Sequence, residues 1–509
     1  MNYLDWISKW SSYTPHKKAV FCTETKQSFS YLQLHQNSLQ IGSYLTNRFH
    51  LKKGDRLAVI AEHSPQYLML FIAAQRLGII LVPLNYRYST SEMLHCLKDV
   101  SPSLILADDF KFETQILDLK KRAEAQIISL ESFFEKAKTI SLDDFEPDFE
   151  IEKEQPVFIF FTSGTTGKPK GVIYTNQMMV WNNLNTAIQL EITSSDHTLN
   201  SLPPYHTSGW NVLLLPMLHR GARVDFISKF KPGKVLSYLQ EQPISLFLAV
   251  PTMLRMMVNS KAFEAFKPKK LNYFIVGGED LSIQLIDAWA KKGILISQGY
   301  GLTEAGPSIT SLHRHEALWK KGSIGKPNFY VDVKIINDEN EEVNNNEPGE
   351  FCVRGHIVTP GYWNNTSYTL GKIKDDWLHT GDVVTKDDDG FLYILGRKNQ
   401  IYISGGENIH PSEIEKTLYK IDGIMEAAVV GVEDEKWGET GVAFVVLDNQ
   451  KLHEKDIRSF LKNNLASYKV PKEIIVMEKL PKSGLGKINK KKLKVAFKKM
   501  NNVKNNFLQ

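Results

Sequence analysis

Short apolar runs alternate with helix-length amphipathic segments along most of the chain, and this alternation constrains the fold more than any other feature. Continuous apolar runs separated by helices are typical of parallel strands that are buried on both faces. The expected strands cover residues 57–61, 79–82, 103–106, 126–130, 156–161, 222–227, 244–250, 273–276 and 294–297. The sequence therefore predicts an α/β fold with layered, mostly parallel sheets.

The pattern changes twice toward the C-terminus. After about residue 325 polar turns separate short strands, and beyond residues 396–400 a smaller α+β pattern begins. With 509 residues the chain is too long for one simple core. We expect a large domain at 1–395 with a β-rich subdomain, a hinge at 396–400 and a small, mobile α+β domain at 401–509. In the small domain, helices at 411–420 and 453–465 are expected to accompany strands at 426–432 and 441–447.

Composition excludes several classes of protein. The chain is 42% apolar and 23% charged, which is close to the average of soluble globular proteins and excludes a disordered or collagenous chain. Gln75 and Arg76 interrupt the longest apolar stretch, no uncharged run reaches the ~18–20 residues that cross a bilayer, and no secretory signal is visible. Three distant cysteines without a CxxC pair indicate a reducing compartment. We expect a soluble cytoplasmic protein.

The net charge of +5 comes from the C-terminal tail. From Lys482 onward there are nine lysines and no acid, whereas the rest of the chain is slightly acidic. The tail contains only two phenylalanines for base stacking, which argues against nucleic acid as a partner. A basic helix end that attracts phosphorylated ligands or makes peripheral contact with an anionic membrane remains open, as does a solvated terminus.

Residues 162–171, with the sequence TSGTTGKPKG, are the most informative segment. They lie between an expected strand and an expected helical run. Glycine lets the backbone approach a ligand closely, backbone N–H groups and hydroxyls can surround phosphate oxygens, and lysine offsets their charge. The GxxxxGK[ST] spacing of the Walker loop is absent. The segment therefore predicts a phosphate-binding loop of another type.

This segment resembles the signature of the adenylate-forming, acyl-activating enzymes, which include acyl- and aryl-CoA ligases, peptide-synthetase adenylation domains and luciferases. Further family motifs follow in order up to about residue 490, and their sequences are most similar to those of acyl-CoA synthetases of the fatty-acid type. The resemblance implies ATP with Mg²⁺ and coenzyme A as reactants. The residues that it assigns to ATP are Thr162, Ser163, Gly164, Thr165, Thr166, Gly167, Lys170, Gly278, Gln298, Gly299, Tyr300, Thr303, Asp382, Arg397 and Lys487.

Several of these residues carry defined roles in the family. The resemblance implies that Tyr300 lies against adenine, that Thr303 contacts the α-phosphate and that Glu304 ligates Mg²⁺, a hard cation that prefers carboxylate oxygen. Asp382 is implied to accept both ribose hydroxyls, which an ionised carboxylate can do. Arg397 is implied to approach the ribose or a phosphate.

The implied catalytic residues are Lys487, Thr303, Glu304 and His206. Lys487 would bridge the attacking carboxylate and the α-phosphate, since a cation between two anions stabilises the transition state. His206 matches the gate of the carboxylate site. Amino-acid-activating domains commonly have an acid there, so a histidine argues against amino-acid substrates. No Ser-His-Asp or Cys-His arrangement has motif support.

Two further groups follow from the resemblance. The acyl pocket is expected to include His206, Gly209, Trp210, Gly277 and Gly301, with Asn211 and Pro307 beside them. Gly405 and Gly406 are expected to let the backbone pass close to the pantetheine arm of coenzyme A. Asn399 and Gln400 depart from the family, which usually has an acidic, basic or small hinge residue followed by Asp. Whether this neutral hinge keeps the family's salt-bridge partners stays open at this point.

The predicted reaction has two steps, in which a carboxylic acid and ATP form acyl-AMP and the acyl group then passes to coenzyme A. The small domain is expected to swing about residues 396–400 between the steps. The preferred acid is a medium- or long-chain fatty acid, and the alternatives are an aromatic acid such as succinylbenzoate or the loading of a carrier protein. A non-catalytic relative would be expected to lack Glu304 or Lys487, and both are present. The oligomeric state stays open, a homodimer included.

Overall fold

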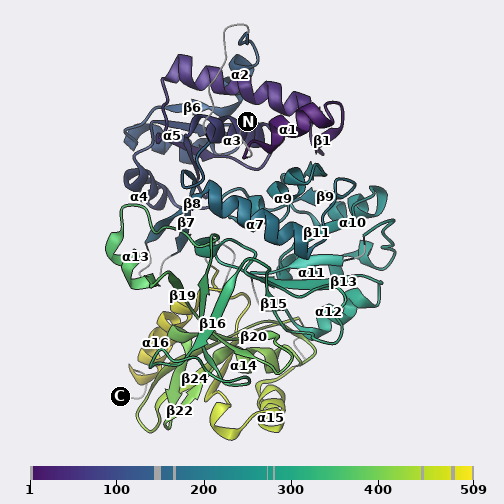
Figure 1. Cartoon of the computed structure of the whole chain (residues 1–509). Coiled ribbons are helices and arrows are strands. Elements are labelled where there is room, and N and C mark those ends of the chain that lie inside the picture. Colours follow the sequence, from purple (N-terminus) through teal and green to yellow (C-terminus); the bar gives the residue numbers. More distant parts are fainter. Residues whose placement is uncertain are drawn as a thin grey trace. The chain divides into compact units, whose positions relative to one another are not determined.

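The computed structural model describes residues 4–142, 151–163, 168–271, 273–278, 281–448, 452–482 and 488–506 (Figure 1). Its internal contacts divide the chain into two compact units. Unit 1 comprises Met1–Gly278, Asp287–Val333 and Val353–Leu378, and unit 2 comprises Glu279–Ile286, Lys334–Cys352 and His379–Gln509. Each unit is described by itself.

A six-stranded sheet forms the first layer of unit 1. Its strand order is β6-β5-β3-β4-β7-β8, and all neighbours are parallel except β7 and β8. The strands are β3 (Arg56–Ile60), β4 (Ile80–Pro83), β5 (Leu104–Ala107), β6 (Ile127–Ser129), β7 (Pro156–Ser163) and β8 (Pro169–Thr175). The residues of β4 and β5 are buried throughout, as expected for parallel strands covered on both faces.

Two smaller sheets also belong to unit 1, and each has parallel neighbours except at one end, where the pairing is antiparallel. The first has the order β2 (Ser28–Ser30), β1 (Lys18–Cys22), β10 (Arg223–Phe226), β9 (His197–Asn200). The second has the order β11 (Leu246–Ala249), β12 (Tyr273–Val276), β13 (Leu295–Tyr300), β14 (Thr310–Ser311), β15 (Lys326–Pro327).

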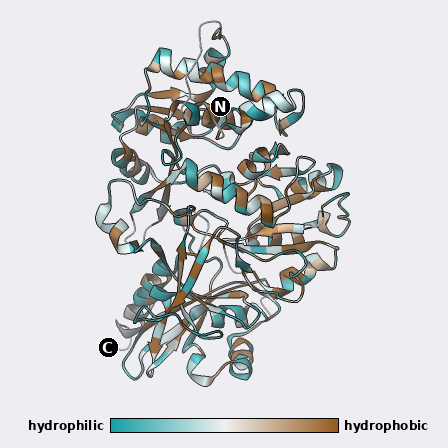
Figure 2. Ribbon diagram, viewed as in Figure 1, coloured by the Kyte–Doolittle hydropathy of each residue, from teal (hydrophilic) through white to brown (hydrophobic). Residues whose placement is uncertain are grey.

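The helices of unit 1 begin and end where the sequence supplies caps. Helix α3 (Pro65–Leu77) starts with a Ser64 side chain that accepts a hydrogen bond from the Tyr67 N–H, and it stops at Gly78, whose φ is +70°. Figure 2 shows helices banded in polar and apolar colours beside mostly apolar strands. Other helices are α1 (Trp6–Tyr13), α2 (Tyr31–Phe49), α4 (Thr90–Val100), α5 (Glu113–Arg122), α6 (Leu130–Ala137) and α7 (Asn176–Gln189).

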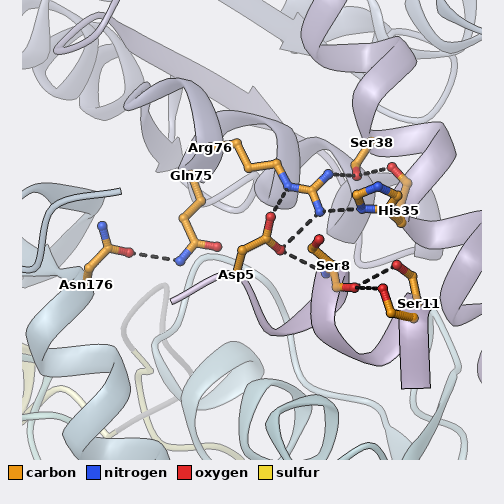
Figure 3. Close-up of polar contacts among 9 residues, drawn as sticks. Asp5, Ser8, Ser11, His35, Ser38, Gln75, Arg76 and Asn176 are labelled. Atoms are coloured by element: carbon orange, nitrogen blue, oxygen red, sulfur yellow. Dashed lines mark hydrogen bonds and ion pairs between the residues drawn. The ribbon is translucent and has the colours of Figure 1, made fainter. Parts of the chain in front are cut away.

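The two polar residues that interrupt the apolar stretch are buried on α3, where each has a specific partner (Figure 3). The Arg76 guanidinium donates to both carboxylate oxygens of Asp5, at 2.8 and 3.1 Å, and to the Ser38 hydroxyl at 2.7 Å. Its Nη2 also lies 2.9 Å from Nδ1 of His35, and burial together with the arginine charge lowers the pKa of this histidine. The Gln75 amide donates to Asn176 on α7. These contacts explain how a charged residue fits inside the apolar core.

Unit 2 contains a sheet with cores on both faces. Its order is β22 (Glu407–Ile409), β21 (Tyr402–Ser404), β24 (Gly438–Leu447), β23 (Ile424–Asp434), and β25 (Glu473–Val476) pairs with β24. Residues along β23 alternate between the two faces, so Val429 packs with α14 (Pro411–Leu418) and α15 (Glu454–Asn464), whereas Val430 packs with α16 (Lys490–Asn506).

A further sheet has the order β16-β17-β19-β18, with β20 paired to β19. The boundary between the units passes through three of these strands. The strands are β16 (Asp332–Ile336), β17 (Gly349–Arg354), β18 (Ile373–Lys374), β19 (Trp377–Lys386) and β20 (Leu392–Arg397).

The predicted α/β class with mostly parallel layered sheets is confirmed, because every expected strand of unit 1 is present within a few residues of its expected bounds. The expected helical run directly after the phosphate loop is wrong, since β8 precedes α7. The residues of β8 include Val172, Ile173 and Tyr174, which favour a strand. The boundaries 1–395, 396–400 and 401–509 stay a prediction. Within the described ranges, no helix combines the length and apolarity that a membrane span requires, and the three cysteines are buried thiols.

Replacing Asp5 by alanine should destabilise unit 1 by about 3–5 kcal/mol, because it leaves the Arg76 guanidinium buried without its carboxylate. Urea denaturation followed by tryptophan fluorescence measures the change. Glu135→Ala is the matched control, since it removes an ion pair with Lys138 whose side chains are both more than half exposed and should cost less than about 1 kcal/mol. Equal effects of the two substitutions would contradict the role given to Arg76.

Candidate active site

The backbone at the end of β13 is packed closely against β12, β14 and the loop that follows, and glycine occupies the tightest positions. A Cβ on Gly277 would lie 2.9 Å from the Gly299 carbonyl oxygen, and one on Gly299 would lie 3.2 Å from the carbonyl oxygen of Thr310. A Cβ on Gly301 would lie within 2.4 Å of three backbone atoms of Pro307. The carboxyl ends of parallel strands are where α/β proteins bind ligands, and here the backbone itself can approach one.

The loop after β13 presents the residues expected to meet phosphate and metal. Tyr300 is buried at the end of the strand, and Thr303 and Glu304 are half-buried in a short 3₁₀ turn (Thr303–Ala305). The Glu304 carboxylate accepts a hydrogen bond of 2.9 Å from the Tyr362 hydroxyl, and its backbone oxygen accepts one of 2.8 Å from the Thr359 N–H. A half-buried carboxylate that accepts a hydrogen bond through one oxygen can bind a hard cation such as Mg²⁺ through the other.

The other strand-end residues assigned to ATP lie in the same sheet. Gln298 belongs to β13 and is buried, and Val276 is its register partner on β12. Gly278 follows β12, is exposed and has a φ of +91°, a conformation that favours glycine. The structure therefore brings Gly277, Gly278 and the 298–304 motif together at one edge of the sheet.

The predicted phosphate loop connects two antiparallel strands. Thr162 on β7 and Lys170 on β8 are register partners, and both are half-buried. The Lys170 ammonium lies 4.3 Å from the ring centroid of Tyr368. Residues Gly164, Thr165, Thr166 and Gly167 lie outside the described part of the chain, as does the side chain of Ser163. The β7–β8 hairpin thus fixes both ends of the loop.

Residues 206–211 contain four of the residues expected at the acyl pocket, and we call them the acyl segment. Three side chains hold the backbone of this segment through its carbonyl oxygens. His63 Nε2 lies 3.2 Å from the Gly209 carbonyl oxygen, and Asn200 donates to the same oxygen at 3.0 Å. Asn182 donates to the Asn211 carbonyl oxygen at 2.5 Å. Because a carbonyl only accepts, His63 carries its hydrogen on Nε2. Burial lowers the pKa of His63 to about 3, so it remains neutral.

The predicted acyl-pocket residues in this segment differ in exposure. Trp210 is fully buried, donates to the Pro204 carbonyl oxygen at 2.7 Å and packs against Phe71 and Phe158. His206 is half-buried. Trp210 therefore anchors the segment in the aromatic core of unit 1, while His206 is the more accessible side chain.

In unit 2, the two residues expected near the ribose are paired across adjacent strands. Asp382 on β19 and Arg397 on β20 are register partners, and Nε of Arg397 lies 2.5 Å from Oδ1 of Asp382. Asp382 is 4% exposed, whereas the Arg397 side chain is 44% exposed. The Asp382 N–H also donates to the Thr380 hydroxyl. Arg397 thereby orients the carboxylate, and Thr380 holds the main chain of Asp382.

The two glycines expected at coenzyme A form the turn of the β21–β22 hairpin in unit 2. Gly405 and Gly406 are exposed and have φ of +60° and +88°, as a two-residue hairpin turn requires. The Gly405 N–H donates to the Trp437 carbonyl oxygen, and a Cβ on Gly405 would meet the Trp437 ring at 3.0 Å. Both glycines thus have a structural reason to be present.

Two observations complete the description of the predicted site. Lys487 lies outside the described residues. A cavity of about 310 Å³ lies elsewhere in unit 1, between β2, α2, α3 and α6, where Phe29, Met69 and Phe134 form part of its wall. None of the residues predicted from the sequence to bind ATP or the acyl group lines this cavity.

The AMP-binding enzyme family matches residues 7–363, and its C-terminal domain matches residues 413–487. The chain belongs to the AMP-binding enzyme family. Feruloyl-CoA synthase from Amycolatopsis sp is 32% identical, over 97% of this chain and 98% of that protein. The long-chain-fatty-acid–CoA ligase FadD13 from Mycobacterium tuberculosis is 31% identical, over 98% and 99%.

Solved structures agree with this assignment. O-succinylbenzoate coenzyme A synthetase from Bacillus subtilis, in complex with ATP and magnesium ion, superimposes with a TM-score of 0.86 and 28% identity, over 95% of this chain and 98% of that one. The resemblance seen in the sequence motifs is therefore confirmed, together with the enzyme class of acid–thiol ligase. ATP and coenzyme A are the co-substrates of this class, and Mg²⁺ accompanies ATP in the solved structure named above.

Sequence reasoning missed the residues that hold this AMP-binding enzyme's motifs in place. Tyr362 contacts Glu304, and His63, Asn182 and Asn200 contact the acyl segment, but no spacing rule connects these pairs, which lie between 9 and 146 residues apart. Only Tyr362 had a local signal, because it lies in the glycine- and aromatic-rich string GYWNN at 361–365.

Gly301→Ala should weaken ATP binding about tenfold or more, because the new methyl group collides with the Pro307 backbone and displaces the loop that carries Glu304. Isothermal titration with ATP and Mg²⁺ measures the affinity. Gly371→Ala, in helix α13 (Thr366–Lys372) where no atom lies within 4 Å of the new methyl group, is the control and should bind like the wild type. Wild-type affinity in both variants would show that the close packing at Gly301 is unimportant.

Proposed function

We propose that this chain is an AMP-forming acyl-CoA ligase that activates a carboxylic acid with ATP and then transfers the acyl group to coenzyme A. The observation that carries the proposal is the loop after β13, where Thr303 and Glu304 follow the strand end and Tyr362 holds the carboxylate. Membership of the AMP-binding family supports the same reaction. The cytoplasm is the proposed compartment, because the chain has three widely spaced cysteines and no CxxC pair, which is typical of a reducing compartment.

In the first step, a carboxylate oxygen of the substrate attacks the α-phosphorus of ATP and pyrophosphate leaves, which gives acyl-AMP. Thr162, Lys170 and the loop between them are the proposed contacts of the phosphates, and Thr303 donates to the α-phosphate. Mg²⁺, when bound at Glu304, neutralises charge that develops on the phosphate oxygens. Lys487 is the proposed cation between the two reacting anions, which is where a positive charge lowers the barrier most.

The remaining assignments concern the nucleoside and the second step. Asp382 is proposed to accept the ribose hydroxyls, and Arg397, which is paired to it, orients its carboxylate. Tyr300 is proposed to lie against adenine. In the second step the thiolate of coenzyme A attacks the acyl carbon and AMP leaves, with the pantetheine arm passing the turn at Gly405 and Gly406.

The proposed substrate is a medium- or long-chain fatty acid. His206 stands where amino-acid-activating relatives carry an acid, so the acyl segment offers no carboxylate to pair with an ammonium group. An aromatic acid is the second candidate, because the feruloyl-CoA synthase relative is 32% identical to this chain and the fatty-acid ligase 31%. A carrier protein is the alternative acceptor to coenzyme A.

Purified enzyme incubated with ATP, Mg²⁺ and a panel of carboxylic acids, with and without coenzyme A, tests the proposal. AMP should appear only when an acid is present, turnover should be sustained only with coenzyme A, and mass spectrometry should detect the acyl-CoA. The fatty acids of the panel should give the highest kcat/KM. If aromatic acids give it instead, the second candidate is the substrate class.

Lys487→Ala, measured in the same panel, tests the role proposed for this lysine. It should form acyl-AMP about 100-fold more slowly or worse, and it should still transfer the acyl group when acyl-AMP is supplied, because the lysine is proposed to act only in the first step.

For the wild-type enzyme, AMP release without acid, or ADP as the product, would contradict the proposed ligase reaction. Adenylate formation without any transfer to coenzyme A would favour a carrier protein as the acceptor.

A further inference from the structure

Tyr362 makes a contact with Glu304 that links two segments far apart in the chain but within unit 1. Its hydroxyl donates to Oε1 of Glu304 at 2.9 Å. Tyr362 is 6% exposed, so this hydrogen bond is largely shielded from water. A phenol that donates to an ionised carboxylate makes a charge-assisted hydrogen bond, which is stronger than one between neutral groups.

The backbone around Tyr362 is fixed from several sides, so its hydroxyl has a defined position. The Tyr362 N–H donates to the Thr369 hydroxyl at 3.0 Å, and Tyr362 forms an isolated antiparallel β-bridge with Val172 on β8. Its ring meets that of Tyr368 edge to face, with 4.7 Å between centroids. The next N–H along the chain, that of Trp363, donates to the Gly171 carbonyl oxygen. Tyr362 is thus tied to the strand that follows the predicted phosphate loop.

The same segment also holds the backbone of Glu304. The Thr359 N–H donates to the Glu304 carbonyl oxygen at 2.8 Å, and the Thr359 hydroxyl donates to the Ile173 carbonyl oxygen at 2.6 Å. Residues 359–362 therefore restrain both the main chain and the side chain of Glu304. Because Thr359 and Tyr362 also contact β8, they connect the Glu304 carboxylate to this strand.

We propose that Tyr362 is a positioning residue that fixes Oε1 of Glu304 and leaves Oε2 for a single contact with Mg²⁺. This inference rests on the proposed role of Glu304 as metal ligand. Mg²⁺ demands nearly octahedral geometry and usually takes one or two protein carboxylates together with phosphate oxygens and water. A carboxylate whose other oxygen is already engaged binds through one oxygen, and a ligand held in place beforehand loses less freedom on binding.

Tyr362→Phe tests the proposal, because it keeps the ring that packs on Tyr368 and removes only the hydroxyl. The affinity of the complex with α,β-methylene-ATP for Mn²⁺, measured by electron paramagnetic resonance, should fall about 10- to 100-fold. The Mg²⁺ concentration for half-maximal activity should rise by a similar factor, and saturating Mg²⁺ should restore most of kcat. Tyr174→Phe is the control, since within the described residues the buried Tyr174 hydroxyl has no hydrogen-bond partner, and its Mn²⁺ affinity should equal that of the wild type.

Wild-type Mn²⁺ affinity in Tyr362→Phe would overturn the proposal, as would an equal loss in Tyr174→Phe. Glu304→Gln separates this failure from that of the proposed function. If Glu304→Gln loses the metal and Tyr362→Phe does not, the carboxylate is the ligand and the positioning role is wrong. If the wild type forms no acyl-AMP with any acid while Tyr362→Phe still weakens Mn²⁺ binding, the proposed reaction fails and the positioning role stands.

Discussion

Close packing of the backbone around β13 is the constraint on which the candidate site depends. Gly277, Gly299 and Gly301 lie where a Cβ would meet backbone atoms at 2.2–3.2 Å, so this packing of the strand end and the loop after it requires residues without a side chain or leaves little room for one. This path of the chain brings Thr303 and Glu304 to the carboxyl edge of a parallel sheet. The hydrogen bond from Tyr362 then orients the carboxylate, and the account of metal and phosphate binding follows from that geometry.

The expected acyl segment depends on the interior of unit 1 in the same way. Two donors, His63 and Asn200, converge on the Gly209 carbonyl oxygen, and Trp210 extends into the aromatic core. Because close-packed interiors transmit small displacements, a change in that core would alter the segment that carries His206. We therefore expect substitutions in that core to change the position of His206.

Much of the fold could be predicted because its information is local. Continuous apolar runs indicate the strands. The phosphate loop expected from TSGTTGKPKG after a buried strand stays a prediction, because residues 164–167 lie outside the described part of the chain. Strand β8 was missed because seven residues after a turn give too short a pattern to separate a strand from the start of a helix. The contacts of Glu304 with Tyr362 and of Arg76 with Asp5 were missed because chain topology, and not spacing, brings such residues together.

The measurement that tests the account most directly is the exchange of labelled pyrophosphate into ATP. The account predicts that the enzyme catalyses this exchange when a suitable carboxylic acid and Mg²⁺ are present, without any need for coenzyme A, because formation of acyl-AMP is reversible on the enzyme. No exchange with any acid, or exchange that proceeds equally well without one, would contradict the claim that this site joins a carboxylate to the α-phosphate of ATP.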